Sequence, residues 1–132
     1  MKGRVIEAAI AKQDGTIGFL DNVASNVGLI NPQGRSVVSI SMNSILDTIP
    51  QRRVDLLKID IEGYERELFE GESAWLTHVR AIIVEFHYSR AENDKMIAFL
   101  ISRGYRYFAP QNRDPSASHG SDFFLRMDKE TR

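Results

Sequence analysis

The sequence predicts an α/β fold whose mainly parallel sheet is closed at the C-terminal end by an antiparallel strand. Strand and helix patterns alternate between residues 54 and 109, and chains of this kind form parallel sheets. The last two strand patterns, residues 105–109 and 122–127, have no helix between them, so we expect them to pair antiparallel.

The N-terminal segment has a weaker strand pattern. Residues 4–12 form an apolar run, and the Asp14-Gly15 pair that follows is typical of a tight hairpin turn. Residues 16–21 would then return as the second strand of a hairpin. Residues 22–35 contain Asn, Gly, Ser and Pro at the density of a loop, and we expect one there.

The elements that follow have clearer boundaries. Residues 36–42 alternate like a strand, and a short helix over residues 45–49, capped by Asn43 or Ser44, would end at Pro50. The remaining elements all show strand or helix periodicity, and we expect strands over residues 54–61 and 81–87 and helical segments over residues 64–69, 73–78 and 91–103.

Composition narrows the class of protein. The chain has 132 residues, the size of one domain, and a net charge of −1, which gives no general attraction to nucleic acid or to acidic membranes. The absence of cysteine excludes disulfides and thiolate catalysis. No apolar stretch reaches membrane-spanning length. We therefore expect a cytoplasmic protein that binds neither nucleic acid nor membranes.

Charged residues gather at the end of the strand predicted over residues 54–61. Side chains alternate along a strand, so Lys58, Asp60 and Glu62 share one face, where burial would be costly without a partner. In open α/β sheets, ligands bind beyond the carboxyl ends of the strands. The alternative is that Asp60 and Glu62 only cap the following helix, although a cap would not explain a buried lysine.

A second group of polar residues ends the next strand. Glu85 and His87 share a face, and we expect Lys58 to neutralise Glu85 and His87 to approach Asp60 across neighbouring strands. A carboxylate beside an imidazole forms a general-base pair, because the carboxylate fixes the tautomer. From spacing alone, a structural ion pair with a surface histidine is the favoured alternative.

These segments resemble the FkbM family of methyltransferases. Residues 55–65, Asp-Leu-Leu-Lys-Ile-Asp-Ile-Glu-Gly-Tyr-Glu, and Leu-Phe-Glu-Gly at residues 68–71 are similar to that family's Lys-x-Asp-x-Glu-Gly strand end and Leu-x-x-Gly helix end. Residues 84–87, Val-Glu-Phe-His, resemble its next strand, and Gly104-Tyr105 resembles a later turn. The resemblance extends over about residues 5–127 and implies a class I methyltransferase-like, Rossmann-like fold.

The resemblance also implies a reaction. Family members are S-adenosylmethionine-dependent O-methyltransferases acting on hydroxyls of sugars, glycans or polyketides. Their domain opens with a strand, a glycine-rich turn and a helix for the cofactor, and no such turn follows a strand here. We therefore expect residues 1–132 to be one N-terminally truncated, partial domain that alone binds S-adenosylmethionine weakly. No residue is assigned to the cofactor.

These observations give a set of roles to test. We expect Asp60 and His87 to act as bases, and Glu62, Lys58 and Glu85 to contact a small-molecule hydroxyl acceptor. No metal is assigned, with a divalent cation on Asp60, Glu62 and His87 kept as an alternative. An unpaired strand edge favours a homodimer. A non-catalytic remnant that serves oligomerisation or partner binding is the rival function.

Overall fold

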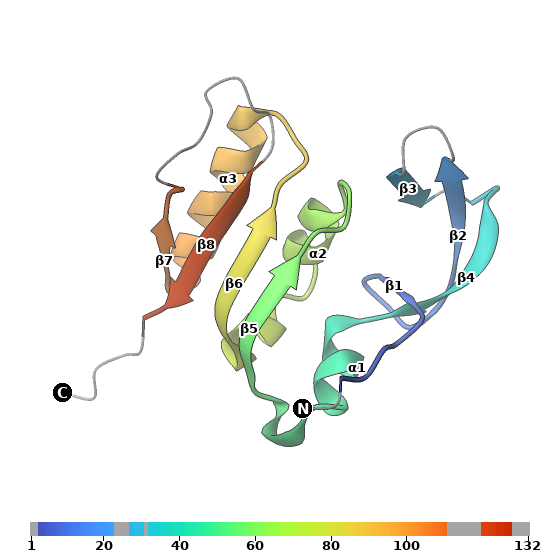
Figure 1. The fold of residues 1–132 in the computed structure, drawn as a ribbon, viewed down its shortest axis with the longest axis horizontal. Coiled ribbons are helices and arrows are strands. Elements are labelled where there is room, and N and C mark those ends of the chain that lie inside the picture. The colour runs from blue at the N-terminus through green and yellow to red at the C-terminus, as the bar shows by residue number, and fades with distance from the viewer. Residues whose placement is uncertain (1–2, 23–26, 31, 111–119, 128–132) are drawn as a thin grey trace.

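A computed structural model of the chain describes residues 3–22, 27–30, 32–110 and 120–127 (Figure 1). Within them the chain is a mixed α/β protein with two four-stranded sheets. The predicted α/β class is confirmed, but each sheet combines parallel and antiparallel pairs, so the sheet is not mainly parallel. Among the described residues, no helix is both long and apolar enough to cross a membrane.

The N-terminal sheet contains β1 (Ala9–Ile10), β2 (Gly15–Asn22), β3 (Val27–Ile30) and β4 (Arg35–Ile40) in the order β1-β4-β2-β3. The predicted hairpin is wrong, because β4 lies between β1 and β2 and pairs with both. Asp14 is engaged elsewhere. Its carboxylate accepts hydrogen bonds from the backbone N–H of Ser41 at 2.7 Å and from the hydroxyl of Ser44.

The segment expected to be a loop contributes a strand instead. β3 pairs antiparallel with β2 over four residues, so pairing with a neighbour outweighs the local turn composition. Residues 23–26 and 31 lie outside the described residues, as do residues 111–119 of the polar segment between the last two strands.

A short helix connects the two sheets. α1 (Met42–Asp47) begins three residues earlier than predicted, because its N-cap is Ser41, which accepts from the backbone N–H of Ser44 at 3.2 Å. The 3₁₀ turn η1 (Pro50–Arg52) follows and leads into the second sheet.

The second sheet has the order β5-β6-β8-β7. Its strands are β5 (Val54–Ile59), β6 (Val79–Glu85), β7 (Tyr105–Phe108) and β8 (Ser121–Arg126). β5 and β6 are parallel, whereas β8 is antiparallel to both β6 and β7. The predicted antiparallel pairing of the last two strands is thereby confirmed.

Helices cover one face of this sheet (Figure 1). They are α2 (Glu65–Glu70), the 3₁₀ turn η2 (Ala74–His78) and α3 (Arg90–Ser102), which ends at Gly104 with a left-handed φ of 92°. The core between helices and sheet is built from large apolar side chains that are almost fully buried: Phe69, Trp75, Leu76, Ile82, Val84, Phe86, Leu100 and Phe124.

β5 lies at the edge of the sheet among the described strands. Leu56, near its middle, is therefore 56% exposed, although its sequence pattern resembles that of a buried strand. The parallel register joins Ile59 to Val84, so the carboxyl ends of β5 and β6 lie side by side. This arrangement places the residues that follow the two strands at one edge of the sheet.

Candidate functional site

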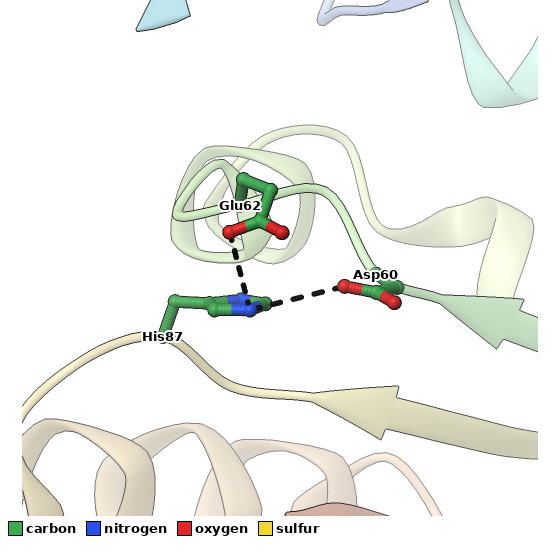
Figure 2. Close-up of side chains that lie close together, drawn as sticks. All are labelled: Asp60, Glu62 and His87. Carbon is green, nitrogen blue, oxygen red and sulfur yellow. Dashed lines mark ion pairs between the residues drawn. The ribbon is translucent and has the colours of Figure 1, made fainter. Parts of the chain in front are cut away.

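The residues that follow β5 and β6 meet at this edge. Asp60 comes directly after β5, and His87 comes two residues after β6. Figure 2 shows the His87 ring directed toward both Asp60 and Glu62. Nε2 of His87 lies 3.8 Å from Oδ1 of Asp60 and 3.5 Å from Oε2 of Glu62. The expected approach of His87 to Asp60 is therefore present in the structure.

A left-handed turn brings Glu62 over the ring. Glu62 has a φ of 50° and Gly63 a φ of 95°, so the chain reverses sharply before α2. The left-handed region costs a residue with a Cβ roughly 1–2 kcal/mol, so the surrounding contacts must hold Glu62 there. The hydroxyl of Tyr88 donates to the carbonyl of Gly63 and accepts from the backbone N–H of Arg66, which fixes both ends of the turn.

Glu65 holds the opposite side of the imidazole. Oε1 of Glu65 lies 2.8 Å from Nδ1 of His87 and accepts from the backbone N–H of Gly63 at 3.3 Å. The Glu65 side chain is completely buried, and its Oε2 has no hydrogen-bond partner within the described part of the chain. Because a carboxylate can only accept, Nδ1 carries the proton and Nε2 faces Asp60 and Glu62.

Electrostatics at the ring favour positive charge. Burial by itself lowers the pKa of His87, but the hydrogen bond and charge of Glu65, together with other nearby carboxylates, raise it more. The pKa of His87 therefore lies above its ordinary value. The side chain is only 13% exposed, so the interpretation of His87 as a surface histidine is wrong.

Asp60, Glu62 and His87 form a cluster, and Lys58 of β5 contacts it through Asp60. Its Nζ lies 2.8 Å from Oδ2 of Asp60, which leaves Oδ1 directed toward His87. The hydrogen bond from Lys58 lowers the pKa of Asp60, so this carboxyl stays ionised. The side chain of Lys58 is 58% exposed, so the prediction of a buried lysine is wrong. It is accessible because β5 is an edge strand in the described sheet.

The predicted ion pair between Lys58 and Glu85 is also wrong. In the parallel register Lys58 lies beside Ile83, and Glu85 lies beside Ser121 of β8. Lys58 therefore pairs with Asp60, two residues along the same strand. Glu85 is half-buried and acts on Lys58 and His87 only through its charge, which raises the pKa of both groups.

The capping alternative for Asp60 and Glu62 does not hold either. α2 begins at Glu65 with Tyr64 as its N-cap, whose side chain makes no capping hydrogen bond, and the backbone N–H of Arg66 in the first turn donates to Tyr88. The acidic residue of its first turn that becomes buried is Glu65.

Sequence reasoning missed two functional positions, Glu65 and Tyr88. Glu65 lies inside the Gly-Tyr-Glu part of the motif, yet nothing in its spacing indicates that it turns inward toward another strand. Tyr88 directly follows His87, and this adjacency is the one feature of the sequence that points to a role for Tyr88 at the site. Both residues fix the geometry of the other groups without lying on the open side of the cluster.

The cluster offers ligands for a cation. One ligand atom each from Asp60, Glu62 and His87 lie within 4.8 Å of one another, and both carboxylates are solvent-exposed. For S-adenosylmethionine the fit is poor, because the turns after β5 and β6 contain one glycine, Gly63, whose carbonyl is bound by Tyr88. The described residues thus provide no glycine-rich cradle for the cofactor.

Comparison with known proteins identifies the family. The family model described as the methyltransferase FkbM domain matches residues 4–107, which include β5, the turn, α2, β6 and every residue of the cluster. No curated protein and no solved structure shows significant similarity to the chain. The match covers most of the chain and contains the strand-end residues described above, so the chain belongs to the FkbM methyltransferase family.

Proposed function

We propose that this chain is the acceptor-binding part of an S-adenosylmethionine-dependent O-methyltransferase. The acceptor is a hydroxyl on a sugar, a glycan or a polyketide-type small molecule. Family membership supports methyl transfer. The observation that carries the proposal is the His87 imidazole, held by buried Glu65 on one side and facing the Asp60 and Glu62 carboxylates on the other.

This arrangement suits removal of a hydroxyl proton. A hydroxyl is a weak nucleophile until its proton is withdrawn, and an imidazole with a fixed tautomer is an effective general base. Glu65 keeps the proton on Nδ1 of His87, so Nε2 accepts the proton of the acceptor. Asp60, ionised beside Lys58, stabilises the imidazolium that results or shares its proton.

The acceptor would contact the exposed polar groups around the ring. Glu62 is 44% exposed and Lys58 is 58% exposed, so both can exchange water for substrate hydroxyls at little cost. Glu85 is the last residue of β6, two residues before His87, and lies at the same edge of the sheet. A polyhydroxylated molecule satisfies several such donors and acceptors at once, which favours a glycan or sugar-like acceptor.

No step is assigned to the methyl donor, because the described residues do not form its site. We infer that residues 1–132 are one partial domain, that the protein is cytoplasmic, and that the donor is held by residues other than those described. The exposed edge of β5, with Leu56 open to solvent, favours a homodimer and equally supports the rival, non-catalytic role in oligomerisation.

The test is transfer of a labelled methyl group to a panel of sugars, glycans and polyketides. It is measured on this chain and on the chain extended upstream of Met1. His87→Gln should reduce the rate by about 10²- to 10⁴-fold, the usual contribution of a general base. His78→Gln, at the end of η2, is the matched control and should leave the rate unchanged. Equal rates for both variants would reject the proposed base.

A further inference from the structure

The cluster at the ends of β5 and β6 also has the geometry of a metal site. We infer that Asp60, Glu62 and His87 bind a divalent first-row transition cation that holds the acceptor hydroxyl. This inference rests on the proposed function for the identity of the acceptor. The binding of the cation does not depend on it.

Distances between the ligand atoms support a shared ion. Nε2 of His87 lies 3.5 Å from Glu62 and 3.8 Å from Asp60, which is too long for good direct hydrogen bonds. An ion that holds its ligands at about 2.1 Å keeps neighbouring ligand atoms roughly 3.0–3.4 Å apart and opposite ones about 4.2 Å apart. The observed 3.5 and 3.8 Å lie between these two values, and all three ligand atoms lie within 4.8 Å of one another, so small rotations of the exposed carboxylates would complete the shell.

The residues behind the ligands supply an independent argument. Metal-binding histidines commonly donate their second ring N–H to a carboxylate, as His87 does to Glu65. Glu65 is completely buried with Oε2 unpartnered among the described residues, and a buried carboxylate of this kind requires positive charge nearby. Because Glu65 binds the imidazole at Nδ1, a cation on Nε2 would place that charge on the other nitrogen of the same ring.

The ligand types select the class of ion. One imidazole nitrogen and two carboxylate oxygens suit Mn²⁺, Fe²⁺ or Zn²⁺ better than Ca²⁺, which takes oxygen ligands. Three protein ligands on a solvent-facing cluster leave coordination positions for water or substrate.

The bound ion would change the chemistry of the acceptor. A hydroxyl oxygen bound to the cation loses its proton at a lower pH, because the metal stabilises the alkoxide. The O–H bond breaks with both electrons left on oxygen, and the proton passes to a solvent water. With the cation on Nε2, His87 acts on the hydroxyl as a ligand of the ion, and in the metal-free protein Nε2 is the general base.

Mn²⁺ alone is the probe for the test, added to the full chain in metal-free buffer. Electron paramagnetic resonance measures binding as the loss of the free-ion signal, and nitrogen coupling in the bound spectrum reports an imidazole ligand. Wild-type protein should bind Mn²⁺ with nitrogen coupling, and Zn²⁺ should displace it. Asp60→Asn and Glu62→Gln should each weaken binding by at least about tenfold, and His87→Gln should also abolish the nitrogen coupling.

Asp55→Asn is the matched control. Asp55 lies on β5, five residues before Asp60, and also pairs with a basic residue two positions earlier, Arg53, at 3.2 Å. This variant should bind Mn²⁺ like the wild type. Glu62 is exposed, so Glu62→Gln remains informative if another variant fails to fold. Absence of Mn²⁺ and Zn²⁺ binding, or binding that none of the three cluster variants weakens, would overturn the metal site.

The outcome separates this inference from the proposed function, because binding requires neither methyl donor nor acceptor. Mn²⁺ binding by a protein that binds S-adenosylmethionine but transfers its methyl group to no hydroxyl would support the site and reject the O-methyltransferase. Methyl transfer at an undiminished rate in the presence of a chelator would overturn the role of the cation and leave His87 as the base.

Discussion

Replacement of Glu65 by leucine tests the interaction that organises the cluster. The change removes a completely buried carboxylate that accepts from Nδ1 of His87 and from the backbone N–H of Gly63. Hydrogen bonds that involve a charged group contribute about 1.5–3 kcal/mol each. Leucine also removes a buried charge whose Oε2 has no partner among the described residues, and this removal favours the folded state. It offsets part of the loss of the two hydrogen bonds, so the free energy of unfolding should fall by about 1.5–3 kcal/mol in total.

Denaturant unfolding measures this loss directly. We expect Glu65→Leu to lower the free energy of unfolding by about 1.5–3 kcal/mol at an unchanged m-value, and the melting temperature by roughly 6–10 °C. Glu65→Gln retains an acceptor oxygen for Nδ1 and should lose less. Glu70→Leu, an exposed position on the same helix, is the control and should stay within about 0.5 kcal/mol of wild type. A Glu65→Leu variant as stable as wild type would refute the argument.

Four further predictions address other parts of the molecule. Hydrogen bonds from Ser44 and Ser41 lower the pKa of Asp14 below its ordinary value of 3.8. Asp14→Asn should therefore lower the melting temperature at neutral pH, and this difference from the wild type should vanish in acid, where Asp14 is protonated. Lys58→Met should barely change the unfolding midpoint, because its ion pair with Asp60 is solvent-exposed. Calorimetric titration of the chain with S-adenosylmethionine should detect no micromolar binding. Light scattering should report a dimer that Leu56→Asp weakens, and a monomer at every concentration would reject the β5 edge contact.

The sequence predicts the second sheet well because its signals are local. The apolar runs of β5 and β6 and the periodicity of α3 depend on neighbouring residues in the chain, and each element forms within two residues of its expected boundaries. The N-terminal sheet is predicted poorly. The pairing of β4 with both β1 and β2 joins segments whose proximity no local pattern encodes, and Asp14 accepts hydrogen bonds from Ser41 and Ser44 at the start of α1 instead of shaping a hairpin.

The same distinction between local patterns and contacts of distant segments applies to the site. The alternation that puts Asp60 at a strand end is local, and the expected neighbouring strand does bring His87 to it. The partner of Lys58 depends on strand register, which places Ile83 rather than Glu85 beside it. Burial of Glu65 accompanies its contact with His87, which follows β6, and periodicity gives no warning of a charged residue on the inner face.

An ion pair repeated at the two ends of β5 shows why only one of these ends forms a site. Arg53 with Asp55 and Lys58 with Asp60 are both basic-acidic pairs two residues apart, joined at 3.2 and 2.8 Å. Asp55 is 74% exposed and its pair is an ordinary solvated contact of an edge strand. Asp60 is half as exposed, because the parallel neighbour ends beside it and supplies His87. The chemistry therefore arises from strand termination and register, since the same pair of charges occurs at both ends of this strand.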